Sequence, residues 1–226
     1  LRKRDFRLTE MIDLAENNDA LYNTDTYGVF FNDWYQGIKK ARRSRKLYGG
    51  LNNNDYLLMS EMKKRGKLVL VEYNTFDYPT ADLERFKTEE LLGITSKKWM
   101  GQYYPTLDTI SDQGVPDWMP ALYRKQHQKP WNYTKPGVVL LKENNIVVLE
   151  EGKHLTSPMP VITTASPYTE KYNLPQLVTF ANSFDIIDPG KNTIVSSFKL
   201  NTTPAGDTLL TANELTSVFP AVVQDA

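Results

Sequence analysis

The stretch Gly66-Lys-Leu-Val-Leu-Val-Glu-Tyr-Asn-Thr-Phe76 decides the fold that the sequence predicts. Its apolar part, residues 68–71, is continuous rather than alternating, which is typical of a strand covered on both faces of a parallel sheet. The strand then ends in polar residues, and Thr80 is placed to cap a new helix. Ligands of open α/β sheets bind at the carboxyl ends of strands, so this transition is a candidate site.

The segments on either side have the order of a parallel α/β unit. Helices are predicted over residues 8–18, 53–66 and 80–93, and a further strand over residues 19–24. A chain that alternates helix, strand, helix, strand and helix places its strands side by side and parallel. We therefore predict a three-layer α/β fold with a mostly parallel sheet.

The rest of the chain has a different character. Residues 94–133 form an irregular, aromatic-rich excursion with one short helix near 118–126, and the clearest hairpin follows at 137–151. Further β-prone segments are 160–164, 177–180, 184–187, 193–200, 208–210 and 219–223. The prediction is an α/β domain at 1–135 and a β-rich portion at 136–226 that packs on the same sheet or extends it.

The composition excludes several classes of function. Lys and Arg total 27 against 27 Asp and Glu, so the chain is not a general nucleic-acid binder. Without cysteine there are no disulfides, thiolate metal sites or cysteine nucleophiles. His127 and His154 are both expected on the surface and too few for a multi-histidine metal centre. No metal and no cofactor are predicted.

Two features of the sequence bear on membrane association, and they lead to different expectations. No run of about 18 apolar residues is present, so this segment has no predicted membrane span. The chain begins at Leu1 rather than at Met, however, which suggests that a signal peptide, a membrane anchor or a further domain precedes it.

Two acidic residues lie at the carboxyl ends of the two predicted parallel strands. Asp25 lies after the first strand and Glu72 within the second, which is predicted over residues 67–73, and neighbouring strands lie about 4.8 Å apart. A carboxylate pair at one sheet edge could act as acid and base on a carbohydrate, or could bind a cation or sugar hydroxyls. In the structural alternative, Asp25 caps a turn and Glu72 pairs with a cation such as Arg85.

Asn74 and three aromatic residues complete the predicted binding site. Asn74 lies in the polar strand end, and Trp99, Tyr103 or Tyr104 could form a floor for a sugar ring. The alternative for the aromatic residues is that they pack the excursion onto the domain.

A basic segment offers a third kind of site. Residues 39–46 contain six cations in eight positions, namely Lys39, Lys40, Arg42, Arg43, Arg45 and Lys46. Such a patch could bind nucleic acid, phosphate or an acidic membrane surface. The alternative is a solvated helix end and loop, because no aromatic residue alternates with these cations to stack bases.

Two resemblances extend this interpretation. The strand ending at Asp25, the helix running to Gly66 and the segment Leu-Val-Leu-Val-Glu72 resemble the class I glutamine amidotransferase-like branch of α/β folds. The resemblance covers roughly residues 5–95 and implies a flavodoxin- or amidotransferase-like sheet. Enzymes of that family use a nucleophilic cysteine, which this chain lacks, so neither amidotransferase activity nor any catalytic residue is implied.

The second resemblance is to uncharacterised bacterial envelope proteins. It rests on the strings Asp25-Thr-Tyr-Gly28, Tyr48-Gly-Gly50, Glu72-Tyr-Asn74 and Trp99-Met-Gly-Gln-Tyr-Tyr104. This resemblance implies an extracytoplasmic domain and brings no known activity with it.

Three functions remain open from the sequence. The leading hypothesis is a non-catalytic domain of a bacterial envelope protein that binds a glycan or another envelope protein, outside the cytoplasm. The alternatives are a carboxylate-based hydrolase acting on carbohydrate and a module that docks on an anionic surface through residues 39–46. A cytoplasmic location is the alternative to the envelope.

Overall fold

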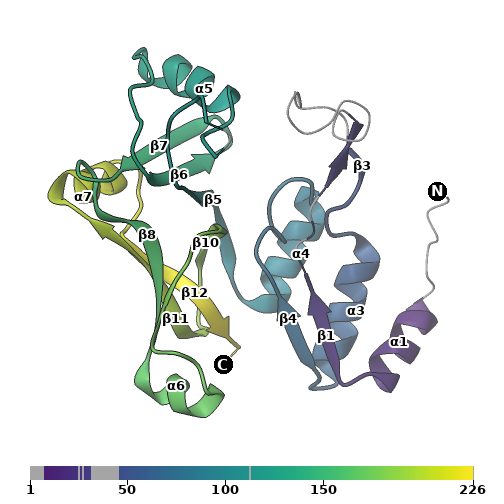
Figure 1. The fold of residues 1–226 in the computed structure, drawn as a ribbon. Coiled ribbons are helices and arrows are strands. Elements are labelled where there is room, and N and C mark those ends of the chain that lie inside the picture. Colours follow the sequence, from purple (N-terminus) through teal and green to yellow (C-terminus); the bar gives the residue numbers. More distant parts are fainter. Residues whose placement is uncertain (1–7, 25, 27, 32–45, 112, 226) are drawn as a thin grey trace. The chain divides into compact units, whose positions relative to one another are not determined.

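The computed structural model describes residues 8–24, 26, 28–31, 46–111 and 113–225. The chain divides into two compact units, Leu1–Leu92 and Gly93–Ala226, and each is considered by itself (Figure 1). The boundary follows the predicted helix–strand–helix unit directly, so the aromatic-rich segment belongs to the second unit.

The first unit contains a parallel pair of strands backed by helices. Its described elements are α1 (Leu8–Asn17), β1 (Ala20–Asn23), β2 (Val29–Phe30), β3 (Lys46–Tyr48), α3 (Asn53–Lys64), β4 (Leu68–Val71) and α4 (Asp82–Leu92). Strands β1 and β4 pair in parallel from Ala20 opposite Leu68 to Asn23 opposite Val71. Helix α3 packs against both strands, and α1 packs against α3 (Figure 1). The predicted side-by-side parallel strands are therefore confirmed.

Local chemistry fixes where α3 begins. The Asn52 side chain accepts a hydrogen bond from the backbone N–H of Asn54 (2.8 Å), and the Asp55 carboxylate accepts one from the backbone N–H of Asn52 (2.9 Å). These reciprocal bonds satisfy donors that the first turn of a helix leaves unpaired. Lys63 and Lys64 in the last turn complement the helix dipole. The helix predicted over 53–66 is confirmed with its end two residues earlier.

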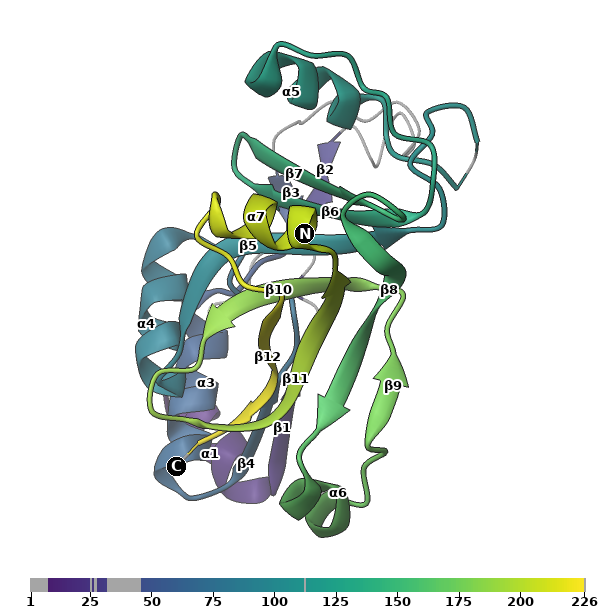
Figure 2. The ribbon, with the colours of Figure 1, turned by 90° about the vertical axis from the view of Figure 1, so that its left-hand side faces the viewer.

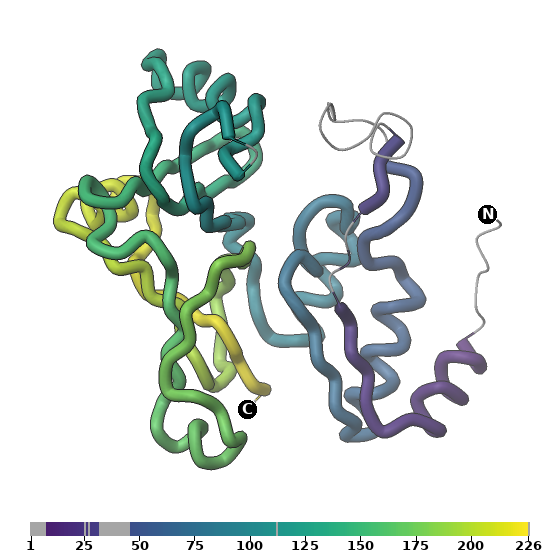
Figure 3. Tube along the Cα trace, viewed as in Figure 1, coloured from purple at the N-terminus to yellow at the C-terminus, as the bar shows by residue number. Residues whose placement is uncertain are grey.

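The second unit is built from two antiparallel sheets. Its elements are β5 (Thr95–Tyr104), α5 (Trp118–His127), β6 (Gly137–Lys142), β7 (Asn145–Glu150), β8 (Leu155–Thr164), α6 (Ser166–Tyr172), β9 (Leu177–Thr179), β10 (Ser183–Asp188), β11 (Thr193–Thr202), α7 (Pro204–Thr211) and β12 (Val218–Gln224). One sheet has the order β10-β5-β6-β7 and the other the order β12-β11-β8-β9. Helix α6 joins the ends of β8 and β9 (Figure 2), and α5 returns over β7 (Figure 3).

Two apolar clusters form the core of the second unit, and the β6–β7 hairpin contributes to both. Val138 and Leu140 belong to one cluster, whereas Val139, between them, belongs to the other. Because successive side chains of a strand point to opposite faces, the hairpin is buried on both faces. Phe184 and Phe198 lie in the first cluster with their ring centroids 4.9 Å apart.

The predicted three-layer, mostly parallel sheet is wrong. Among the paired strands of the described residues, β1 and β4 alone are parallel, and the other pairings are antiparallel. The continuous apolar run of β4 is misleading because its burial alternates: Leu68 and Leu70 are 55% and 48% exposed. Of the mixed α/β prediction, the general class is correct and the parallel three-layer architecture is not.

Three local predictions also need correction. Residues 95–104 form the long strand β5 rather than an irregular segment, although the helix predicted near 118–126 is confirmed as α5. Residues 208–210 lie in α7 rather than in a strand, because Thr203 caps that helix and Pro204 occupies its first turn. His154, expected on the surface, is 7% exposed.

The surroundings of the buried His154 favour its neutral form. Its Nδ1 accepts a hydrogen bond from the backbone N–H of Glu150 (3.2 Å), which requires the unprotonated nitrogen. Burial, with a smaller contribution from Lys153, lowers the pKa of His154 below its ordinary value of 6.5, while Glu150 opposes the shift. The unfolded chain therefore binds the proton more readily than the folded chain does.

We predict that the free energy of unfolding decreases as pH falls below 6.5 toward the lower folded pKa of His154. Urea unfolding measured between pH 7.5 and 5 checks this. In His154→Asn, whose amide oxygen can still accept from Glu150, the decrease over this range should be smaller. An equal decrease in both proteins would contradict the assignment to His154.

Gly101 tests the packing of the first apolar cluster. A Cβ at this position would lie 2.2 Å from Cζ of Phe184 and 2.9 Å from Cδ2 of Leu140. We predict that Gly101→Ala lowers the free energy of unfolding by about 1–3 kcal/mol, because the buried ring must move. Adding Phe184→Leu should make the two losses less than additive in denaturant unfolding, and strict additivity would contradict the contact.

Candidate functional site

The candidate site is the loop of residues 72–81, which folds across the carboxyl ends of β1 and β4. The backbone N–H of Glu72 donates to the carbonyl of Asn23 (3.0 Å), extending the ladder by one bond. The buried Thr75 hydroxyl donates to the Glu72 carbonyl (2.7 Å) and accepts from the Asn23 side-chain amide (3.2 Å). One hydroxyl thus ties the end of β1 to the end of β4.

A second threonine holds the other end of the loop. The buried Thr80 hydroxyl donates to the carbonyl of Thr75 (2.9 Å) and accepts from the backbone N–H of Leu51 (2.9 Å). Thr80 therefore joins the loop to the segment that leads into α3. The prediction that Thr80 caps the following helix is wrong, because α4 begins at Asp82 and the Thr80 hydroxyl bonds to Thr75 and Leu51 instead.

The close approach of two loops explains why position 50 is a glycine. Gly50 has φ +77°, and a Cβ there would lie 2.7 Å from the backbone of Pro79 and Thr80. The absence of a side chain lets the two backbones approach each other. Asn74 also has a left-handed backbone (φ 63°), which asparagine tolerates better than most residues, and its carbonyl accepts from the Thr26 hydroxyl (3.0 Å).

Tyr22 and Glu72 form the polar pair of the site. Both side chains are exposed, and the Tyr22 phenol donates a hydrogen bond to Oε1 of Glu72. Tyr22 lies opposite Leu70 in the register, and Glu72 is two residues beyond Leu70, so the three share one face of the sheet. The hydrogen bond to the carboxylate raises the pKa of Tyr22 above its ordinary 10.0, so the phenol is a donor at neutral pH.

The predicted carboxylate pair is only half described. Asp25 lies outside the described residues, so its pairing with Glu72 stays a prediction. Arg85, the cation suggested as a partner of Glu72, pairs instead within its own helix with Asp82 (2.6 Å) and Glu89 (3.5 Å). Pairing of Glu72 with another cation stays a prediction. Glu72 contacts the Tyr22 phenol, a partner that the sequence pattern did not indicate.

The predicted aromatic floor is divided between two cores. Trp99 is 5% exposed and belongs to one apolar cluster of the second unit, whereas Tyr104 is 6% exposed and belongs to the other. Burial raises the pKa of Tyr104, whose phenol donates to the Gln102 side chain (3.0 Å). Tyr103 is half-buried. The role of these three residues in binding stays a prediction, and the burial of Trp99 and Tyr104 favours packing.

Of the six cations in residues 39–46, the structure describes Lys46 alone. Lys46 is exposed in β3, and its ammonium donates to the carbonyl of Pro79 (2.8 Å) in the candidate loop. Lys39, Lys40, Arg42, Arg43 and Arg45 lie outside the described residues. Docking through residues 39–46 therefore stays a prediction.

The described residues contain neither a candidate metal cluster nor a candidate membrane-spanning helix. Within residues 8–24, 26, 28–31, 46–111 and 113–225, no three His, Asp or Glu side chains are grouped closely enough to hold a metal ion. The same part of the chain contains no helix with the length and apolar character that crossing a bilayer requires.

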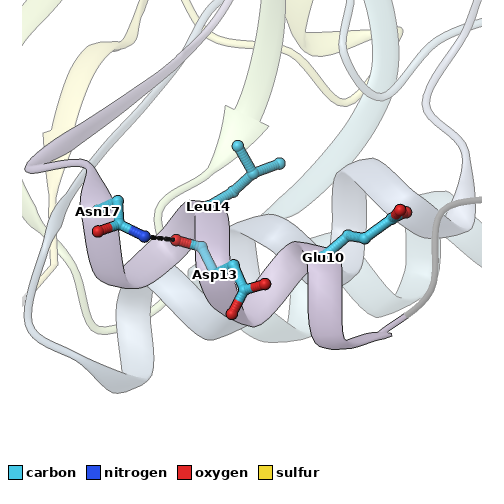
Figure 4. A pocket seen from close by; sticks show the side chains of 4 residues that line it. All are labelled: Glu10, Asp13, Leu14 and Asn17. Carbon is cyan, nitrogen blue, oxygen red and sulfur yellow. Dashed lines mark hydrogen bonds between the residues drawn. The ribbon is translucent and has the colours of Figure 1, made fainter.

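A hollow of about 350 Å³ on α1 is a weaker candidate (Figure 4). Its lining residues Glu10, Asp13, Leu14 and Asn17 all come from one helix, and the Asn17 amide donates to the Asp13 carbonyl (2.8 Å). This hollow does not bring together groups from separate described elements, as the 72–81 loop does.

Comparisons with protein-family models, with curated proteins and with solved structures find no match to this chain. The resemblances to the amidotransferase-like branch and to bacterial envelope proteins therefore stay predictions.

Thr80 provides a direct test of how the loop is held. We predict that Thr80→Val lowers the free energy of unfolding by about 1–3 kcal/mol, because the Leu51 N–H loses its acceptor in a buried position. Thr80→Ser retains the hydroxyl and is the matched control, with a smaller loss. A larger loss for Ser than for Val in urea unfolding would show that the methyl group, not the hydroxyl, stabilises the loop.

Proposed function

We propose that the protein is a non-catalytic carbohydrate-binding protein whose binding surface is the carboxyl edge of the β1–β4 pair. The observation that carries the proposal is the exposed Tyr22–Glu72 pair, supported on a loop that Thr75 and Thr80 hold in place. This position agrees with the general location of ligand sites in parallel α/β units.

The pair offers the two contacts that a sugar needs. The Tyr22 ring is 57% exposed and presents an apolar face with a polar tip. The Glu72 carboxylate accepts hydrogen bonds, and bonds to charged groups are stronger than those between neutral groups. A second exposed ring, Tyr78 (59%), lies in the same loop and stacks on Phe30. A sugar can place its C–H face on a ring and its hydroxyls on the carboxylate.

The chemistry favours binding over hydrolysis. A glycosidase uses two carboxyl groups at a defined separation, one of them as a proton donor. The described pair instead joins one carboxylate to a phenol whose raised pKa keeps it protonated. Hydrolysis is the alternative function, and it would require Asp25 as the second carboxylate.

A carbohydrate ligand also agrees with the predicted location in a bacterial envelope. The location in the envelope is part of the proposal.

We predict that the protein binds neutral oligosaccharides, and that Glu72→Gln weakens this binding at least 10-fold because the carboxylate is lost. A panel of gluco-, manno- and xylo-oligosaccharides in isothermal titration calorimetry checks this. Glu90→Gln, which removes an exposed carboxylate of α4, should bind like the unmodified protein. The thermal midpoints of both variants should change little, because both side chains are exposed.

The same titrations distinguish ring contact from hydrogen bonding. Tyr22→Ala should weaken binding more than Tyr22→Phe, which keeps the ring and loses the phenol. Absence of binding to every oligosaccharide, or equal affinity in Glu72→Gln, would contradict the proposal. Release of reducing ends that stops in Glu72→Gln would establish the hydrolase instead.

A further inference from the structure

A polar hollow of about 490 Å³ lies in the second unit, far along the chain from the Tyr22–Glu72 pair. Its lining residues are Ser96, Lys97, Lys98, Trp99, Lys142, Glu143 and Glu214, and we call it the lysine–glutamate hollow. These residues come from three segments: the start of β5, the β6–β7 turn and the turn after α7.

A β-bulge places two of the lysines in the hollow. Trp99 pairs with Ile186 of β10 and Ser96 pairs with the next residue, Ile187, so Lys97 and Lys98 have no partner on β10. The backbone N–H of Lys98 instead donates to the Ser96 hydroxyl (3.0 Å). Bulges of this kind redirect side chains and occur preferentially near functional sites. Both lysine side chains are exposed.

Each of the three segments contributes a charged residue with a left-handed backbone. Lys98 has φ 58°, Glu143 φ 54° and Glu214 φ 59°. Glycine adopts this conformation readily, whereas a long side chain is disfavoured there. Of the six non-glycine residues with positive φ in the described part of the chain, these three line one hollow. Left-handed residues occur in hairpin turns, as at Glu143, and also at functional sites.

The charges of the hollow are not paired with one another. Among the described residues, none of Lys97, Lys98, Lys142, Glu143 and Glu214 has an ion-pair partner within 4.0 Å. The Lys142 ammonium lies 5.8 Å from the centre of the Trp99 ring. Three lysines against two glutamates leave one net positive charge.

We propose that the lysine–glutamate hollow binds a uronic acid unit of an acidic polysaccharide. The single carboxylate of a uronate matches the net charge and accepts hydrogen bonds from the lysines. Its hydroxyls donate to Glu143 and Glu214, which would otherwise face the ligand as unpaired carboxylates. Inorganic phosphate or sulfate lacks those several donors, and a neutral sugar lacks the anion. This site is independent of the Tyr22–Glu72 pair.

The direct test is titration of the full chain with trigalacturonate at low salt. Calorimetry gives the affinity. In Glu72→Gln, in which binding of neutral sugars at the Tyr22–Glu72 pair is weakened, we expect trigalacturonate to bind at least 10-fold more tightly than neutral galactotriose, inorganic phosphate or sulfate. The affinity should decrease with added salt. Equal affinity of this variant for phosphate or for galactotriose, or absence of trigalacturonate binding, would overturn the proposal.

Variants separate binding from stability. Lys98→Gly and Glu143→Gly each remove a charged group and relieve a left-handed backbone. We expect each to raise the thermal midpoint and to weaken trigalacturonate binding at least 10-fold. Gln128→Gly relieves a similar backbone (φ 55°) outside the hollow, so it should raise the midpoint and leave binding unchanged.

One further variant distinguishes this site from the proposed function. Glu72→Gln should leave trigalacturonate binding unchanged, because Glu72 does not line the hollow. Unchanged binding in both Lys98→Gly and Glu143→Gly, or loss of binding in Glu72→Gln, would overturn the assignment to the lysine–glutamate hollow.

Discussion

The Thr75 hydroxyl is the interaction on which the candidate site depends. Because Thr75 is fully buried, its hydroxyl must be satisfied by protein groups, and Asn23 and the Glu72 carbonyl supply them. These two bonds place the ends of β1 and β4 side by side. The Tyr22 phenol and the Glu72 carboxylate then meet on the open face of the pair. The hydrogen bonds of the buried Thr75 hydroxyl thus determine where the exposed Tyr22 and Glu72 side chains meet.

The sequence predicted elements better than it predicted how they assemble. The capped helix α3, the β6–β7 hairpin and the parallel neighbours β1 and β4 follow from caps, turns and the alternation of helix and strand. The predicted parallel sheet was too large. The apolar run at 68–71 resembles a strand covered on both faces, but its side chains alternate in exposure. Antiparallel pairings such as β11 with β12 depend on long-range packing that residue types do not specify.

The side chains of the candidate site could likewise be predicted only in part from the sequence. Glu72 could be singled out because a strand ends there in polar residues. Tyr22 could not, because its contact with Glu72 joins residues 50 positions apart and follows from the register of β1 against β4. Trp99 and Tyr104 appeared equivalent as aromatic candidates for a sugar-binding floor, whereas the pleat of β5 directs them to different apolar clusters.

The two proposed sites differ in what recognises the ligand. At the Tyr22–Glu72 pair, ring and carboxylate address an uncharged sugar, and in the lysine–glutamate hollow a net positive charge addresses an acidic one. Binding of a neutral sugar at the Tyr22–Glu72 pair is the central claim. Magnetization transfer between a bound neutral oligosaccharide and the protein, measured by NMR, tests it most directly. The account predicts transfer between sugar ring protons and the Tyr22 ring; transfer confined to other residues would contradict it.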